Sequence, residues 1–112
     1  MHYEEPKKIA KEEAEKIFVS ENKDAICDAL VGIAYYDPDW RWVQSYCLLF
    51  LNHRDADIRG LAATCLGHLA RIHRVIDLNI VLPELKKLLK DPEIGGRVED
   101  ALSDIEIFLK NN

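Results

Sequence analysis

Hydrophobic residues recur every three or four positions along almost the whole chain, a spacing that predicts α-helices and no strands. The pattern predicts six helices, over about residues 5–19, 22–36, 38–51, 55–72, 78–90 and 92–110. Pro6 suits the first turn of the first helix, where a missing backbone N–H has no cost. Pro83 is tolerated only near a helix start, so it favours a true start of the fifth helix within residues 79–81.

Polar residues predict where several helices begin. Ser20 or Asn22 is the expected N-cap of the second helix, because both side chains accept hydrogen bonds from free backbone N–H groups. Asp37-Pro38 and Asp91-Pro92 each place a capping residue before a proline at the first helical position, which is a helix-start signal. The third helix is apolar almost all round, so we expect it to be covered on more than one side.

The fourth predicted helix has three different faces. Its core face holds large residues at helical spacing: Ile58, Leu61, Ala62, Cys65, Leu66, Leu69 and Ile72. Its second face consists of small residues: Gly60, Ala63, Gly67 and Ala70. Because glycine inside a helix costs about 1 kcal/mol, two glycines on one face indicate that another backbone packs very near. Its third face is polar: Asp57, Thr64, His68 and Arg71.

Three helix starts resemble one another, each with an acidic cap and an apolar residue three positions later. They are separated by 18 and 36 residues: Asp37-Pro38-Asp39-Trp40, Asp55-Ala56-Asp57-Ile58 and Asp91-Pro92-Glu93-Ile94. One pair of helices therefore occupies about 36 residues. A repeat of this length with two helices per unit predicts an α-solenoid.

The stretch from Asp55 to Gly67 resembles the second helix of a HEAT repeat, whose pattern is Asp-x-x-Val-Arg followed by Ala-Ala, a small residue and Leu-Gly. The residues that carry the resemblance are Asp55, Ile58, Arg59, Ala62, Ala63, Cys65, Leu66 and Gly67. The next unit matches less fully, because Gly95 stands where the family has arginine. The resemblance covers residues 38–109, and the first two helices carry no motif.

The resemblance implies an all-α fold, a short right-handed solenoid of about six helices in three antiparallel pairs. We expect a single domain over residues 1–112, with a degenerate or capping helix pair at 1–37 and repeats at 38–74 and 75–112. The second helix of each pair would line a concave surface that takes a partner protein. These are expectations from fold, and fold alone does not fix function.

Composition narrows the function classes. The chain has 112 residues, 48 % hydrophobic and 31 % charged, with a net charge of −5. This acidity disfavours nucleic acid and anionic membranes, which are bound through lysine and arginine. No apolar run reaches the length of a membrane span and the N-terminus lacks a signal-peptide pattern. Three cysteines in apolar stripes, Cys27, Cys47 and Cys65, are expected to be free thiols in the cytoplasm.

Charge is distributed unevenly. Residues 51–76 hold four arginines against two aspartates, whereas residues 77–112 hold eight acids against five bases. The predicted partner-binding residues come from these two regions and from an aromatic cluster: Arg54, Arg59, Thr64, His68, Arg71, Arg74, Trp42, Tyr46, Arg97, Asp100 and Asp104. The alternative for the charged residues is a solvated face with ion pairs between repeats, in which Arg59 is structural. The alternative for the aromatic residues is burial between helices.

Catalytic and metal-binding motifs are absent from the sequence. His68 and His73 are five positions apart and do not converge on one helix face, and the chain has no HExxH, GxSxG or phosphate-binding glycine motif. We therefore predict no enzyme activity, no metal and no cofactor.

The expected function is binding of another protein through the concave face. Small acidic bacterial HEAT-like proteins resemble immunity proteins of polymorphic toxin systems, which would make the partner a toxin domain and the acidic last helix a contact for a basic toxin. Alternatives are an accessory subunit or a small enzyme of the bilin-lyase or DNA-glycosylase type. A further alternative is a scaffold that forms a homodimer through its solenoid ends.

Overall fold

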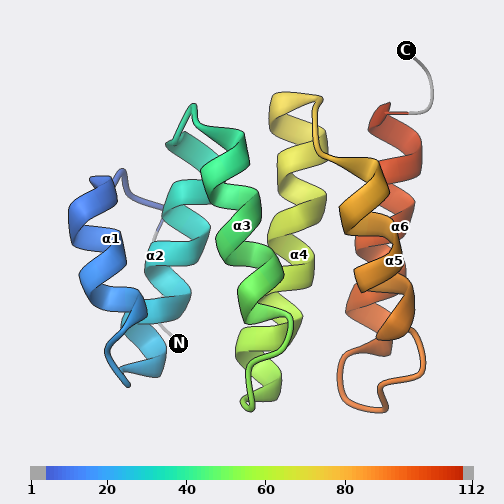
Figure 1. Ribbon diagram of the computed structural model, residues 1–112, viewed down its shortest axis with the longest axis horizontal. Helices are drawn as coiled ribbons and strands as arrows, with labels where there is room; N and C mark the ends of the chain where they lie inside the picture. The colour runs from blue at the N-terminus through green and yellow to red at the C-terminus, as the bar shows by residue number, and fades with distance from the viewer. Residues whose placement is uncertain (1–4, 110–112) are drawn as a thin grey trace.

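The structure, a computed structural model, describes residues 5–109 and is all-helical, with six helices and no strand in that range (Figure 1). The helices are α1 (Lys11–Phe18), α2 (Lys23–Tyr36), α3 (Trp40–Phe50), α4 (Ala56–His73), α5 (Leu78–Lys87) and α6 (Gly95–Leu109). The predicted helical class and number of helices are therefore confirmed. The predicted helix end at Lys110 lies outside the described residues.

The predicted start of the first helix was wrong. Residues 5–10 have no helical structure, and Ala10 precedes α1 in an extended conformation. The segment instead packs on α2, where a Cβ at Gly32 would overlap the carbonyl oxygen of Lys7. Ile9 packs against the hydrophobic core. Packing on α2 thus overrides the helical pattern that these residues show in sequence.

Capping explains the other helix starts. Asn22 accepts a hydrogen bond from the Ala25 backbone N–H at 3.1 Å and caps α2. α3 begins later than predicted, because Asp39 is its cap and Asp37 instead accepts from the Asp39 N–H at 2.9 Å. α6 also begins later, at Gly95, although Asp91 accepts from the Glu93 and Ile94 N–H groups in the preceding turn. The short asparagine and aspartate side chains therefore stabilise turns as well as helix ends.

α5 begins at Leu78, so the later start predicted from Pro83 was wrong. The helix ends at Lys87, three residues before the predicted end at residue 90. Pro83 is the sixth residue of α5 and cannot donate to the carbonyl of Asn79. Both residues are exposed, so water can hydrogen-bond the carbonyl that the proline leaves unpaired. The helix tolerates the proline for this reason.

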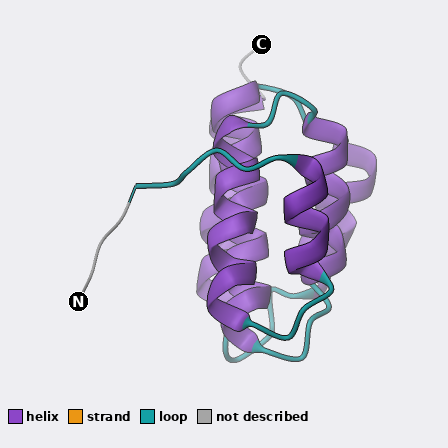
Figure 2. Ribbon diagram, turned by 90° about the vertical axis from the view of Figure 1, so that its left-hand side faces the viewer, coloured by secondary structure: helices purple, strands orange, loops and turns teal. Residues whose placement is uncertain are grey.

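The helices form two layers. α1, α3 and α5 lie in front of α2, α4 and α6 in Figure 1, and Figure 2 shows the same layers from the side. α4 is central and packs most extensively on α6, followed by α2 and α3. The small face of α4 allows the contact with α6, since a Cβ at Gly67 would lie 3.4 Å from the Cα of Ala101. The predicted close approach of another backbone is confirmed there, whereas Gly60 faces the side chain of Arg97.

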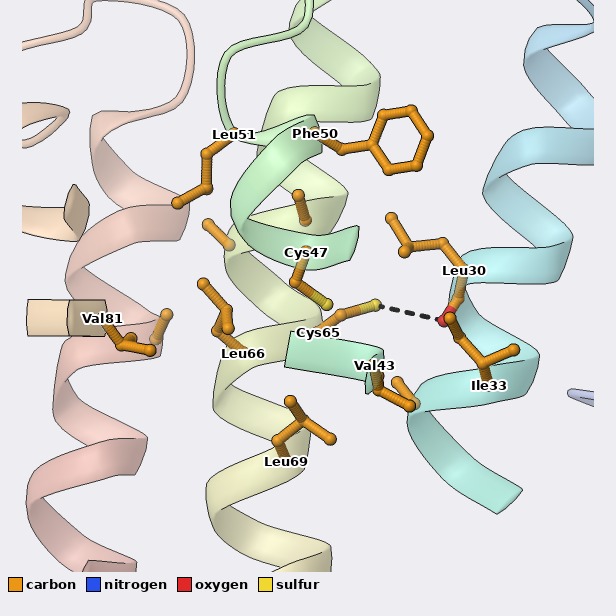
Figure 3. Close-up of a cluster of buried hydrophobic side chains, with 14 of the residues drawn as sticks. Leu30, Ile33, Val43, Cys47, Phe50, Leu51, Cys65, Leu66, Leu69 and Val81 are labelled. Atoms are coloured by element: carbon orange, nitrogen blue, oxygen red, sulfur yellow. Dashed lines mark hydrogen bonds between the residues drawn. The ribbon is translucent and has the colours of Figure 1, made fainter. Parts of the chain in front are cut away.

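The core includes residues of all six helices, and Figure 3 shows the part of it around Cys47 and Cys65. Cys47 and Cys65 are fully buried in it, and the Cys65 thiol donates to the Leu30 carbonyl at 3.9 Å. The hydrogen bond with Cys65 and burial together raise the pKa of the Cys47 thiol well above its ordinary value. All three cysteines are free, and Cys27 is half-buried. Cys47 and Cys65 act here as small hydrophobic residues, as predicted.

Several side chains depart from the predicted core. Leu49 is 61 % exposed although it lies on the apolar α3, and Leu89 and Ile72 are also exposed. Gln44 is buried instead, because its side-chain oxygen accepts from the Asp77 backbone N–H at 2.7 Å at the start of α5. A polar residue in the middle of α3 thus connects this helix to the start of α5. None of the described helices is long and apolar enough to span a membrane.

Candidate partner-binding surfaces

An aromatic and basic cluster lies where α2 meets α4. The rings of Tyr35 and His68 contact edge to face with centroids 5.0 Å apart. The Arg71 guanidinium lies 2.8 Å from Nδ1 of His68, to which it donates, and its Cζ is 6.0 Å from the centre of the Tyr35 ring. Burial lowers the pKa of His68, and the charges of Arg71 and Arg97 lower it further, while Asp104 opposes them. The neutral imidazole therefore accepts from Arg71 and holds it in place.

Two more arginines continue this surface over α6. Nε of Arg97 donates to the hydroxyl of Thr64 at 3.2 Å, and that hydroxyl donates to the Gly60 carbonyl at 3.1 Å. The guanidinium of Arg74 lies over the Phe108 ring, 5.2 Å from its centroid. We call this surface the arginine face and define it by residues of α2, α4 and α6 and of the α4 C-cap: Tyr35, Thr64, His68, Arg71, Arg74 and Arg97.

The three arginines of this face have no carboxylate partner among the described residues. Within residues 5–109, neither Arg71, Arg74 nor Arg97 forms an ion pair. Their guanidinium groups are positioned by an imidazole, a hydroxyl and aromatic rings, all of which are uncharged. The face therefore presents oriented positive charge that a partner's carboxylates could neutralise.

The predicted acidic residues of α6 border the arginine face. Asp104 is half-buried beside Gly67, where a Cβ would lie 3.1 Å from its carboxylate oxygen. Asp100 is exposed on the same helix. The structure thus brings together seven of the predicted site residues on α4, α6 and the α4 C-cap: Thr64, His68, Arg71, Arg74, Arg97, Asp100 and Asp104.

Arg59 lies largely buried between the α3–α4 loop and the turn before α6. Its side chain is 15 % exposed, and it donates to the carbonyls of His53 and Arg54 at 3.0 Å each. It also pairs with Asp91 and Glu93, which precede α6, at 3.4 Å each. Its contacts connect the α3–α4 loop to the turn before α6, as the structural alternative for this residue expects. Arg54 lies away from the arginine face on the α3–α4 loop, where its side chain is 86 % exposed.

Trp42 and Tyr46 lie in the other layer. Both are half-buried against α1, with the Trp42 indole N–H and the Tyr46 hydroxyl each 3.4 Å from the Glu15 carboxylate. Tyr46 also contacts the Phe18 ring at 4.6 Å between centroids. The aromatic cluster therefore joins α1 to α3, and the structure does not bring it together with the arginine face.

A second candidate surface is an apolar groove of about 440 Å³ between α5 and α6. Its lining is mostly aliphatic, with one lysine and one glutamate: Leu78, Leu82, Lys86, Leu102, Ile105, Glu106 and Leu109. We call it the α5–α6 groove. It lies on the last two described helices of the chain.

Residues 5–109 contain no group of three or more histidine, cysteine or acidic side chains that could hold a metal ion. His73 has one buried ring nitrogen, Nε2, without a hydrogen-bond partner.

Sequence reasoning did not predict Tyr35 as part of the arginine face. The position of Tyr35 in the helix could have indicated that its side chain lies outside the core. The core residues of α2 include Leu30 and Ile33, and Tyr35 is two positions after Ile33, on a different side of the helix.

These features define an all-helical protein with surfaces suited to another protein. A search of solved structures finds a chain in the crystal structure of a CDI complex from Cupriavidus taiwanensis LMG 19424. The two chains are 38 % identical over 96 % of this chain and 97 % of that one, with a TM-score of 0.86. This chain therefore belongs to the same family as that component of the CDI complex. No family model and no curated protein matches it.

Proposed function

We propose that this chain is an immunity-type protein that binds and neutralises a partner of a contact-dependent inhibition (CDI) system without catalysing a reaction. The observation that carries the proposal is the 38 % identity, over nearly the full length of both chains, with a component of a CDI complex. The partner would be a protein toxin. Free thiols at all three cysteines favour action in the reducing cytoplasm.

We further propose that the fold is a HEAT-like right-handed solenoid of three antiparallel pairs. Two observations support this. Asp55 and Asp91 cap equivalent turns in successive units, each accepting from the N–H groups two and three residues later. Arg59 stands at the arginine position of the HEAT pattern and bonds the loop of the next unit.

The arginine face is the proposed contact surface. It lies on α2, α4 and α6, the helices that the HEAT resemblance makes concave. Arginine and tyrosine are the residues that most often dominate binding energy at interfaces. The net charge of −5 favours a protein over a nucleic acid as the partner, and exposed Asp100 supplies an adjacent contact of opposite charge.

The experiment is affinity capture of the tagged chain from its native host, followed by titration of the recovered protein in purified form. We expect one stoichiometric partner that inhibits bacterial growth when produced alone and does not when this chain is co-produced. No stoichiometric partner, or a partner without growth-inhibiting activity, contradicts the proposal.

The contact surface is tested by the double variant Arg71→Glu/Arg97→Glu. We expect it to weaken binding about 100-fold, since charged residues at the centre of an interface each contribute severalfold to tenfold or more. Arg41→Glu is the matched control, because Arg41 is an exposed arginine on α3 in the other layer. Equal affinities for the two variants would remove the arginine face from the contact.

A further inference from the structure

The arginine face carries positive charge that its own surroundings do not neutralise. Elsewhere within residues 5–109, Arg54 and Arg59 each pair with carboxylates, whereas the three arginines of the face form no such pair there. The chain has 20 acidic residues against 15 lysines and arginines, so carboxylates are not scarce. The positive charge of this face is therefore left for a partner to neutralise.

Each guanidinium of the face is held by an uncharged group. Arg71 donates to the imidazole of His68 at 2.8 Å, and Nε of Arg97 donates to the hydroxyl of Thr64 at 3.2 Å. The guanidinium of Arg74 packs on an aromatic ring. These contacts use few of the N–H donors that a guanidinium carries. Because the side chains are already oriented, pairing with a carboxylate would cost them little conformational entropy.

The arginines are spread along the face and are not gathered at one point. Arg97 contacts Thr64, and Arg71 follows Thr64 by seven residues in α4, which is about 10 Å along the helix axis. Arg74, the C-cap, follows three residues later and extends the face to about 15 Å. An acidic patch that covers this length carries carboxylates at several points, as one side of two helical turns does.

We propose that the arginine face binds a carboxylate-rich surface of the toxin partner, an inference that rests on the proposed function and names the chemistry of the surface that is covered. Bidentate hydrogen bonds between guanidinium and carboxylate supply the specific contacts. The complementary charges also speed the encounter of the two proteins. The contact is local, so it does not require the chain as a whole to be basic.

Phosphates of a nucleic acid fit this face less well. The ring of Tyr35 already contacts the His68 ring, and the Arg71 guanidinium lies near it, so Tyr35 is not free to stack on a base. Asp100, which is exposed, and Asp104, which is half-buried, lie on the same border. Their charges repel a polyanion that extends beyond the arginines.

The test is an NMR titration of the full chain with a synthetic peptide of about eight alternating glutamate and alanine residues. We expect the side-chain Nε–H signals of Arg71 and Arg97 to shift progressively, with a Kd of about 1 mM. Salt at about 0.5 M should abolish the shifts, because it screens the charges. A lysine–alanine peptide of the same length is the matched control and should leave these signals unchanged.

Neutral variants of the arginines locate the binding. Arg71→Gln and Arg97→Gln should each weaken binding of the acidic peptide by at least about threefold. Arg41→Gln, at an exposed arginine of α3 in the other layer, is the matched control and should not. The unchanged backbone spectrum of each variant shows that it keeps its fold.

The imidazole of His68 gives a second readout. Burial lowers its pKa, the charges of Arg71 and Arg97 lower it further, and Asp104 opposes them. Carboxylates bound beside these arginines add negative charge, so the pKa of His68 should rise when the acidic peptide binds. The ring proton shifts of His68, followed against pH with and without peptide, measure this change, which an uncharged contact would not produce.

Three outcomes overturn the proposal. The first is the absence of shifts at the arginines with about 10 mM peptide, a concentration well above the expected Kd. The second is an equal loss of binding in Arg41→Gln. The third is binding of a short oligothymidylate of the same charge at these arginines about tenfold more tightly than the peptide, which would assign the face to nucleic acid.

Failure of this proposal and failure of the proposed function can be told apart. If the captured partner is neutralised by this chain but its affinity depends neither on salt nor on Arg71→Gln, the carboxylate contact is wrong and the immunity function stands. If no partner is captured, the immunity function fails, and the peptide titration still decides whether the arginine face binds carboxylates.

Discussion

At the N-terminal end of the molecule, an extended segment lies along α2 and Ile9 closes the apolar contact, whereas at the C-terminal end no part of residues 5–109 covers the α5–α6 groove. α1 is only 8 residues long, and the residues before it pack on α2 instead of extending the helix. One end of a helical fold can thus be covered by its own chain while, within the described residues, the other end is not.

The largest expected effect comes from the helix that links the two ends. Leu66→Ala in α4 removes a side chain that is fully buried and should lower the free energy of unfolding by about 2–5 kcal/mol. Leu49→Ala, at a leucine that is 61 % exposed, is the control and should change it by less than about 0.5 kcal/mol. Urea denaturation measures both. Because α4 contacts both halves, we expect one transition; two separate transitions would show that the ends unfold independently.

Arg59→Met tests the connection to the C-terminal end. The variant keeps an apolar stem and removes the hydrogen bonds to the His53 and Arg54 carbonyls, which should destabilise the protein by about 1–3 kcal/mol. Hydrogen exchange should rise most in residues 88–94, where Arg59 pairs with Asp91 and Glu93. The segment before α1 should be unaffected, and faster exchange there would mean that Arg59 acts on the whole fold.

Gly32→Ala tests the cover at the N-terminal end. The added Cβ would overlap the Lys7 carbonyl, and overpacking of this kind costs about 1–3 kcal/mol. The helix propensity of alanine offsets about 1 kcal/mol of that cost. We expect a net loss of stability, with faster hydrogen exchange in residues 5–10. Gly96→Ala is the matched control: no atom lies within 4 Å of its added Cβ, so this variant should gain stability. A gain in both variants would show that the segment moves aside freely.

The smallest effect concerns pH at two capping carboxylates. Hydrogen bonds from the Glu93 and Ile94 N–H groups, together with Arg59, lower the pKa of Asp91, and Lys11 lowers that of Asp39. A carboxylate whose pKa is lowered by folding stabilises the folded state at any pH above the ordinary pKa of 3.8. This stabilisation is lost as the pH falls through the lower pKa of the folded state. Asp91→Asn and Asp39→Asn should therefore be less stable than the parent at pH 7, with the difference shrinking in acid.

The effect of salt on stability should differ between the ion pairs of Asp39 and Asp91. The Lys11–Asp39 pair is exposed, at 41 % and 45 %, so added salt should remove most of its contribution. The Arg59–Asp91 pair is exposed at only 15 % and 17 % and should keep more of it. Denaturation midpoints at low and high ionic strength measure this; equal salt sensitivity would mean that the burial of Asp91 has no electrostatic effect.

Much of the fold follows from local pattern. The spacing of apolar residues in α2 and α4 predicts these helices almost to the residue, because Asn22 and Asp55 cap them with their own side chains. The pattern fails at residues 5–10, whose conformation depends on a contact with Gly32, more than 20 positions away. It also fails at Gln44, which is buried only because the N–H of Asp77 lies opposite its side chain.

The candidate site, like the fold, could be predicted only in part from the sequence. The polar stripe of α4 predicts that Thr64, His68 and Arg71 share a face, because residues three and four positions apart in a helix are neighbours. That Arg97 reaches Thr64 and that Tyr35 supports His68 could not be predicted, since both depend on the order in which helices pack. The separation of Trp42 from this face has the same origin.

The sequence by itself determined the helical class, most of the helix boundaries and the small face of α4, because these depend on interactions within a few residues and on helical periodicity. Only the tertiary structure decided which charges find partners: within residues 5–109, Arg59 pairs with carboxylates and Arg71 does not. It also decided that the segment before α1 packs on α2, whereas no other described residue covers the α5–α6 groove. Both outcomes depend on contacts between residues far apart in the chain, whose distances no local pattern specifies.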